Sequence, residues 1–138
     1  MKTEKSCGAV VFTRENGNIQ YVIIQSKEGF FGFPKGHTEG TETERETALR
    51  EIKEETGLNV RFIDDFRAEV THTLKRGNET RLKQVVYFLA EFSKQFITVQ
   101  KDELSGIYLM DFETAMASFH FENSKEVLLK AHKFLTDN

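Results

Sequence analysis

The chain has 138 residues, of which 38% are hydrophobic and 30% charged, and its formal net charge is −3. This length predicts one domain spanning residues 1–138, because compact domains most often contain roughly 100–150 residues. The apolar fraction excludes a disordered chain, no apolar run approaches the roughly 18 residues of a membrane span, and the N-terminal stretch does not resemble a secretion signal. The single cysteine, Cys7, cannot form an internal disulfide. We therefore expect a cytoplasmic, monomeric protein without a membrane partner, and the acidic net charge argues against duplex nucleic acid as a partner.

Two apolar segments near the N-terminus predict buried strands at Ser6–Phe12 and Tyr21–Gln25. Residues 15–18, Glu-Asn-Gly-Asn, favour a turn, so the two strands are expected to form a hairpin with a longer loop. A segment rich in glycine and phenylalanine, residues 29–37, follows and contains the only proline, Pro34. We expect a loop there.

Residues 43–56 predict a helix. Thr43 and Glu46 have the spacing of a capping box, and Gly57 is a typical helix stop. The helix carries an apolar stripe, which we expect to lie on a sheet, formed by Ala48, Leu49 and Ile52.

The second half of the chain reads as strands followed by helices. We predict one long or broken strand over Val60–Leu74, a turn at residues 75–79, a central strand at Gln84–Phe92 and a short strand near Gly106–Met110. Two helices complete the chain, one capped by Asp111 and ending at Ser118, the other capped by Asn123 or Ser124 and ending near Leu135. Strands with one inserted helix, followed by further strands and helices, predict an α+β protein in which helices cover a mixed sheet as an α/β/α sandwich.

The predicted helix over residues 43–56 concentrates carboxylates on one side. At 100° per residue, Glu51, Glu54 and Glu55 fall within an arc of about 100°, and the like-charged pair four residues apart costs a few tenths of a kcal/mol. A solvated surface would explain the acids if they were merely good helix formers. A hard divalent cation, Mg²⁺ or Mn²⁺, would explain why they are crowded, because carboxylate oxygens are its preferred ligands. Arg50 lies beside this arc and can orient a carboxylate through paired N–H donors.

The same residues belong to a longer pattern. Gly36, Glu42 and the run Arg50-Glu51-Ile52-Lys53-Glu54-Glu55-Thr56-Gly57-Leu58 resemble a complete Nudix box, Gly-x5-Glu-x7-Arg-Glu-U-x-Glu-Glu-x-Gly-U, where U is aliphatic, over residues 36–58. Nudix proteins hydrolyse nucleoside diphosphates linked to another moiety and are built as an α/β/α sandwich with a mixed sheet. The resemblance therefore implies the same fold as the element order.

Further segments are similar to the asymmetrical diadenosine tetraphosphate hydrolases, the bis(5'-nucleosyl)-tetraphosphatase subfamily. They are residues 7–12, 33–37, 47–51, 85–91 and 132–135. This resemblance implies a Mg²⁺-dependent hydrolase, with Mn²⁺ as a substitute ion, that binds a dinucleoside polyphosphate as its substrate. It would convert diadenosine tetraphosphate to ATP and AMP.

The resemblance also implies roles for particular residues. Metal ligands would be Glu51, Glu54, Glu55, the carbonyl of Gly36 and, from a later loop, Glu103. Arg50 belongs to the catalytic motif, and either Glu51 or Glu103 would be the general base. Phosphate contacts would come from Lys35, His37, Arg81 and Lys83, and the adenine base would stack between Phe134 and His72, where the subfamily usually has an aromatic residue such as Tyr.

Five of these residues also have a purely structural interpretation. Glu103 fits a solvated loop acid, Arg81 and Lys83 fit surface charges, His37 fits a turn residue, and Phe134 fits the core side of the last helix. Alternative functions are an RNA 5'-pyrophosphohydrolase, a nucleoside triphosphate pyrophosphohydrolase, a nucleotide- or ADP-ribose-sensing module without catalysis, and an acidic helix that binds another protein.

Overall fold

A computed structural model describes residues 2–15, 17–100 and 102–137 of the chain. Its elements, in chain order, are β1 (Lys2–Thr13), β2 (Gln20–Ser26), β3 (Phe31–Gly32), β4 (Lys35–His37), α1 (Glu44–Thr56), β5 (Arg61–Phe62), β6 (Ala68–Arg76), β7 (Glu79–Glu91), β8 (Leu104–Met110), α2 (Phe112–Ser118) and α3 (Glu122–Thr136). No helix in the described ranges is long and apolar enough to cross a membrane.

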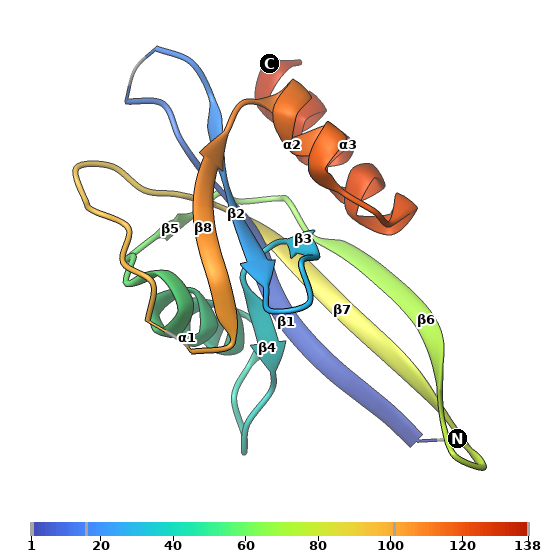
Figure 1. The fold of residues 1–138 in the computed structure, drawn as a ribbon. Coiled ribbons are helices and arrows are strands. Elements are labelled where there is room, and N and C mark those ends of the chain that lie inside the picture. Colours follow the sequence, from blue (N-terminus) through green and yellow to red (C-terminus); the bar gives the residue numbers. More distant parts are fainter. Residues whose placement is uncertain (1, 16, 101, 138) are drawn as a thin grey trace.

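The strands form one mixed sheet built around β1 and β7. These two strands run parallel, with residues 2–12 of β1 beside residues 81–91 of β7. The outer side of β1 pairs with β4 at residues 6–8 and with β2 at residues 12–13, both antiparallel. The outer side of β7 pairs with β6 and β5, and β8 pairs with β2. Figure 1 shows β6 and β7 as a long hairpin that extends along the N-terminal half of β1.

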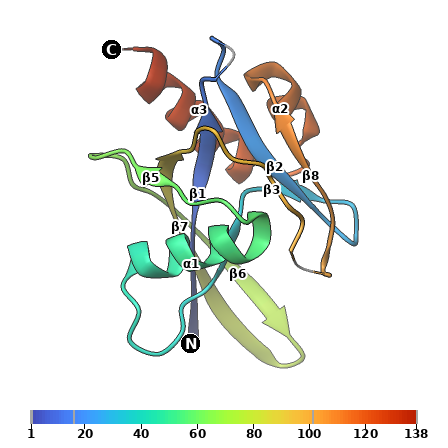
Figure 2. The same ribbon diagram turned by 90° about the vertical axis from the view of Figure 1, so that its left-hand side faces the viewer.

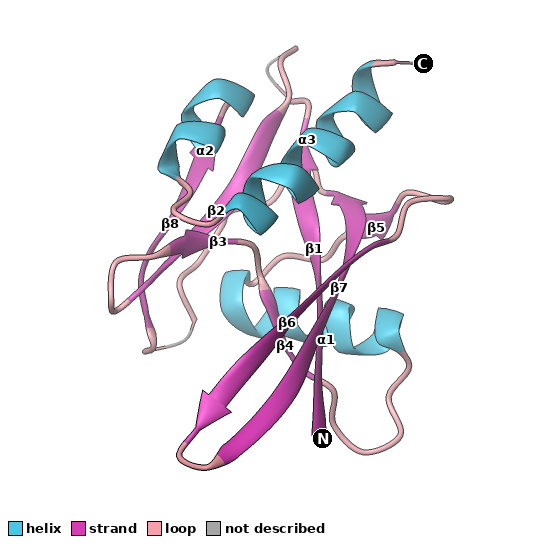
Figure 3. Ribbon diagram, turned by 90° about the vertical axis from the view of Figure 1, so that its right-hand side faces the viewer, coloured by secondary structure: helices cyan, strands magenta, loops and turns pink. Residues whose placement is uncertain are grey.

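Helices cover both faces of this sheet. Side chains along a strand alternate between faces, so the apolar central strands present a hydrophobic surface on each side. On β1, Cys7, Ala9 and Val11 face α1, where they join a buried cluster with Ala48 and Ile52. The neighbouring residues of β1 and β7 face α2 and α3 in a second buried cluster. Figures 2 and 3 show α1 on one side of the sheet and α2 with α3 on the other. The predicted α/β/α sandwich is therefore confirmed.

Helix α1 begins and ends as predicted. The Thr43 side chain accepts a hydrogen bond from the Glu46 backbone, the Glu46 side chain accepts one from the Thr43 backbone, and Gly57 follows in the left-handed conformation with φ of 75°. The apolar stripe is only partly confirmed: Ala48 and Ile52 are fully buried, but Leu49 is exposed. The buried arc of α1 is rotated toward Glu51 and Glu55, and this rotation moves Leu49 into solvent.

Several predicted boundaries differ from the structure. The expected loop at residues 29–37 contains the short strands β3 and β4, which its glycines and proline concealed. The segment 60–74 is broken into β5 and β6, and β7 begins five residues earlier than predicted. Asp111 caps α2 as predicted. The cap predicted for α3 is wrong, because α3 begins at Glu122 after Phe121, which places Asn123 and Ser124 inside its first turn.

Candidate active site

Strand β4 brings a glycine against the acidic face of α1. A Cβ atom placed on Gly36 would lie 2.1 Å from Cδ and 2.2 Å from Oε2 of Glu51. Next to it, the backbone N–H of Lys35 donates to Oε2 of Glu55 over 3.0 Å. Gly36 is held there because β4 pairs with β1, with Gly36 opposite Cys7. The missing side chain is thus what allows the backbone to reach the Glu51 carboxylate.

Arg50 ties the acidic residues together from the solvent side. Its Nε and Nη2 donate to the two oxygens of Glu42 over 2.7 and 3.1 Å. Its Nη2 also donates to the carbonyl of His37 over 2.9 Å, and its Nη1 contacts Glu51 over 3.0 Å and Glu54 over 3.2 Å. The two hydrogen bonds from Arg50 to Glu42 are the main reason that the pKa of Glu42 is lowered to about 2. A planar guanidinium has five N–H donors in a fixed fork, so it can bond both oxygens of Glu42 and still reach Glu51 and Glu54, whereas an ammonium group has only three donors and no such fork.

Two of the carboxylates are nearly buried. Glu51 and Glu55 are each 6% exposed, and an ionised carboxylate at such a position requires compensating charge or hydrogen bonds. Glu44 lies two turns earlier on α1 and pairs with Arg67 and Lys5. The carboxylates that gather at Arg50 and β4 are therefore Glu51, Glu54 and Glu55.

The donor set of this cluster suits Mg²⁺, since it consists of carboxylate oxygens beside an accessible backbone segment. In the described ranges, however, no three His, Cys, Asp or Glu side chains are arranged to enclose a metal ion. The Arg50 guanidinium contacts both Glu51 and Glu54 and provides positive charge there. The three carboxylates are therefore close together along one helix but not yet turned toward one point.

A cleft of about 670 Å³ meets this cluster at Lys35, which lines the cleft and whose backbone N–H donates to Glu55. Three predicted phosphate- or base-binding residues line it together: Lys35, His72 and Lys83. Burial, and then the nearby charge of Lys83, lowers the pKa of Lys35. Aromatic side chains form much of the remaining wall: Phe30, Phe31, Phe33, Tyr87 and Phe121.

Other predicted contacts lie elsewhere. Arg81 donates to Glu4 over 2.9 Å and to Glu79 over 3.3 Å. The ring of Phe134 packs against Phe66, with centroids 5.5 Å apart, at the edge of the core cluster under α3. Since the cleft-lining residues of α3 are Asn123 and Ser124, Phe134 is about 15 Å away along the helix.

The side chains of His37 and Glu103 are exposed, and the hydrogen bonds of both residues are made by their backbones. The carbonyl of His37 accepts from Arg50, while its side chain is exposed. Glu103 is exposed, and its carbonyl accepts from the backbone N–H of Lys27 over 3.2 Å. Its preceding loop runs past the end of α1, where the backbone N–H of Gln100 donates to the carbonyl of Glu55. Lys101 lies outside the described residues.

The sequence analysis missed Phe30 and Phe121 as site residues. Both are exposed, and their rings lie 5.4 Å apart at the cleft. They are 91 positions apart in the chain, so no local spacing could connect them. The sequence carried no signal for them, because hydrophobic residues that are exposed singly are normal on a protein surface, and only their meeting in the fold makes a patch.

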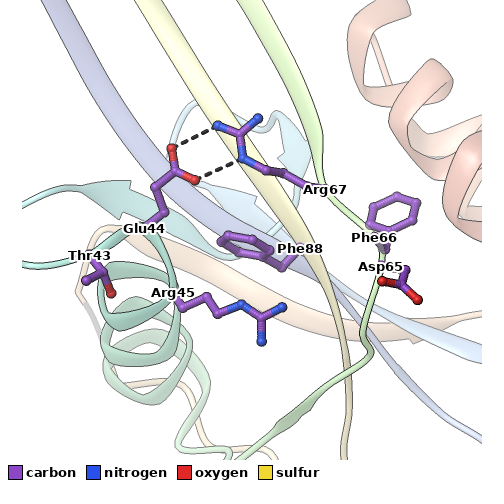
Figure 4. A pocket seen from close by; sticks show the side chains of 7 residues that line it. All are labelled: Thr43, Glu44, Arg45, Asp65, Phe66, Arg67 and Phe88. Atoms are coloured by element: carbon purple, nitrogen blue, oxygen red, sulfur yellow. Dashed lines mark hydrogen bonds and ion pairs between the residues drawn. The ribbon is translucent and has the colours of Figure 1, made fainter.

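A second cavity, of about 830 Å³, lies between the start of α1 and residues 65–67 (Figure 4). Most of the charged side chains that line it interact with other residues of the protein. Glu44 and Arg67 form two hydrogen bonds of 2.8 and 2.9 Å, and Arg45 lies over the rings of Phe62 and Phe88. The cavity therefore offers few free polar groups, and the cleft beside the carboxylates is the better candidate for the site.

Comparison with known proteins agrees with this geometry. The chain is 29% identical to the Mus musculus protein named "Bis(5'-nucleosyl)-tetraphosphatase [asymmetrical]", covering 95% of both chains. Its fold is similar to that of a C. elegans Ap4A hydrolase in a binary complex, with a TM-score of 0.86, 22% identity, and coverage of 98% and 99% of the two chains. It is also similar to the NUDIX domain of Shewanella oneidensis NrtR complexed with ADP ribose, with a TM-score of 0.76, 17% identity, and coverage of 99% and 90%.

The family model described as the NUDIX domain matches residues 3–131, nearly the whole chain and all of the Gly36–Leu58 motif. With the carboxylate cluster and the adjoining cleft, this match shows that the chain belongs to the NUDIX domain family and is a Nudix hydrolase.

Proposed function

We propose that this protein hydrolyses a phosphoanhydride bond in dinucleoside polyphosphates and converts diadenosine tetraphosphate to ATP and AMP. One observation carries the proposal. Lys35 lines the cleft with its side chain, bonds Glu55 through its backbone N–H, and precedes the glycine that lies against Glu51. A phosphate held by Lys35 would therefore lie beside the catalytic carboxylates. The name of the mouse relative supports the same reaction.

The cleft matches the chemistry of this substrate. Ligand sites in proteins usually measure roughly 300–1,000 Å³, and the volume of about 670 Å³ lies within that range. Lys35 and Lys83 provide positive charge for the polyphosphate chain. The Phe30 and Phe121 rings, with His72, provide flat surfaces for a nucleobase. In this proposal Phe121, rather than Phe134, stacks on the base.

We further propose that Mg²⁺ is held by Glu51, Glu54 and Glu55 with the carbonyl of Gly36, and that Glu103 joins them from its loop. When bound, Mg²⁺ would supply positive charge against the polyphosphate and Lewis-acid activation of water. Arg50 restrains Glu51 and Glu54 from the outer side. Either Glu51 or Glu103 accepts the proton of the attacking water, and Lys35 and Lys83 balance the charge on the departing phosphate.

Hydrolysis in heavy-oxygen water tests the reaction. The purified protein is incubated with Mg²⁺ and diadenosine tetraphosphate, and mass spectrometry then shows which product carries the label. We expect ATP and AMP, with the label in one of them. A panel of triphosphorylated RNA, nucleoside triphosphates and ADP-ribose covers the alternatives. Product from RNA alone, or Mg²⁺-independent ADP-ribose binding with no product from any substrate, would contradict the proposal.

Substitutions on one helix test the carboxylates. Glu54→Gln or Glu55→Gln should lower turnover by at least ~10²-fold without changing the melting temperature. Glu46→Gln is the matched control, because it makes the same change on α1 outside the cluster and glutamine preserves a capping box. Full Mg²⁺-dependent turnover in Glu54→Gln or Glu55→Gln would refute their assignment. The loss of activity in Glu51→Gln and Glu103→Gln, compared across pH, distinguishes the two candidate bases.

A further inference from the structure

A carboxylate lies beside the cleft lysine that is proposed to bind phosphate. In the parallel pair of β1 and β7, Glu4 is the Cα partner of Lys83. Partners in adjacent strands are roughly 4.8 Å apart and project from the same face of the sheet. Figure 3 shows the start of β1 alongside the β6–β7 hairpin on which Lys83 lies. A glutamate at this position is well placed to pair with Lys83 and compete with a phosphate.

The structure shows a different pairing. Nη1 of Arg81 donates to Oε1 of Glu4 over 2.9 Å, and Arg81 lies two residues from Lys83 on the same face. Glu4 is 14% exposed, and its pKa lies below its usual value chiefly because of Arg81. Across the described residues, no ion pair within 4 Å joins Lys83 to any acidic group. The lysine therefore faces the cleft with its charge unshared.

The Glu4 carboxylate is only partly satisfied. Its Oε2 is buried and accepts no hydrogen bond from the described residues, and Nε of Arg81 is equally without an acceptor. The other nearby cation, Arg76, is 3.7 Å from Glu4 and 61% exposed, so solvent screens it. If Arg81 were lost, Glu4 would have two acceptor oxygens with Lys83 on the adjacent strand.

We propose that Arg81 is a positioning residue: it holds Glu4 and thereby keeps Lys83 available to the substrate phosphate. This proposal rests on the proposed role of Lys83 in phosphate binding. It replaces the sequence-based expectation that Arg81 contacts phosphate itself. The two roles differ in one consequence, since a positioning role depends on the charge of Glu4 and a direct contact does not.

Four proteins test this difference: wild type, Arg81→Met, Glu4→Gln and the double variant. Their KM and kcat for diadenosine tetraphosphate are measured at saturating Mg²⁺. Arg81→Met should raise KM about fivefold, as expected for a new competing ion pair, with kcat within about twofold of wild type. The double variant should have the same KM as Glu4→Gln. An unchanged KM in Arg81→Met, or an equal loss with and without Glu4, would overturn the proposal.

Two controls separate a loss of folding, and a failure of the proposed function, from a failure of the positioning role. If Arg81→Met unfolds because it leaves Glu4 unpaired, Glu4→Gln and the double variant still decide the question, since neither carries that carboxylate. Equal KM values support the positioning role, and a higher KM in the double variant refutes it. If wild type does not hydrolyse the dinucleotide, the proposed function fails, and calorimetric binding of inorganic tripolyphosphate to the same four proteins replaces the kinetic measurement with the same expected pattern.

Discussion

Gly36→Ala should inactivate the enzyme while leaving it folded. A Cβ atom at this position would lie 2.1 Å from Cδ of Glu51, whereas real Cβ contacts are essentially never shorter than 3.0 Å, so the carboxylate must move by about 1 Å. That shift acts on the same Oε2 atom that Arg50 holds over 3.0 Å. A displacement of about 1 Å in a catalytic group can cost ~10²-fold in rate. We therefore expect kcat/KM to fall by at least ~10²-fold.

The contrast with Gly8→Ala makes the experiment specific. A Cβ at Gly8 would lie 2.0 Å from the carbonyl oxygen of Pro34, which is backbone and cannot turn aside. Gly8→Ala should therefore lower the free energy of unfolding by ~1–3 kcal/mol, whereas Gly36→Ala meets only the end of the Glu51 side chain and should change it less. Kinetics and denaturant unfolding of both variants are compared. Activity of Gly36→Ala within threefold of wild type would refute the requirement for the observed Glu51 position.

Three further predictions concern the surrounding interactions. Arg50→Lys should reduce turnover at least ~10-fold, because an ammonium group lacks the planar fork that bonds both oxygens of Glu42 while it holds Glu51 and Glu54. Steady-state kinetics would show this, and wild-type rates would count against the role of the fork. Tyr21→Phe removes a 2.6 Å hydrogen bond to Nδ1 of His132 and should cost about 1 kcal/mol in urea unfolding with no change in turnover. Hydrogen bonds from Arg67 and, less strongly, Lys5 lower the pKa of Glu44 from 4.5 to about 2. The pairing of Glu44 therefore stabilises the fold above pH 4.5, and its contribution is lost as pH falls toward 2. Glu44→Gln should therefore make acid unfolding less steep over this interval, and an unchanged pH profile would exclude the pair as a source of stability.

Local patterns were sufficient for the ends of α1 but not for the start of α3, whose predicted capping residues lie inside its first turn. Thr43, Glu46 and Gly57 define the ends of α1 through hydrogen bonds within a few residues, so their spacing alone predicted the helix. The rotation of α1 was harder to predict. Leu49 was expected to be buried and is exposed, because β4 packs over Glu51 and Glu55, and this contact is not encoded in the apolar periodicity of the helix.

The predicted substrate-binding residues also differ in whether the fold places them at the cleft. His72 and Lys83 were expected to bind substrate, and the register of β6 against β7 places them side by side. Arg81 and Phe134 carried suitable chemistry but found partners inside the fold, Glu4 and Phe66. The residue type does not show whether an arginine or a phenylalanine lines a cleft or contacts another side chain inside the fold, so composition could not separate these cases.

The amino-acid order by itself determined the carboxylate cluster, because residues three and four apart on a helix share a face whatever surrounds it. Tertiary structure alone decided what lies opposite that face, namely Lys35 and Gly36 from β4. It also brought Phe30 and Phe121 together in the aromatic wall of the cleft. These segments meet only because β1 pairs with both β4 and β7, and strand pairing over long sequence separations depends on packing across the whole sheet rather than on any local pattern.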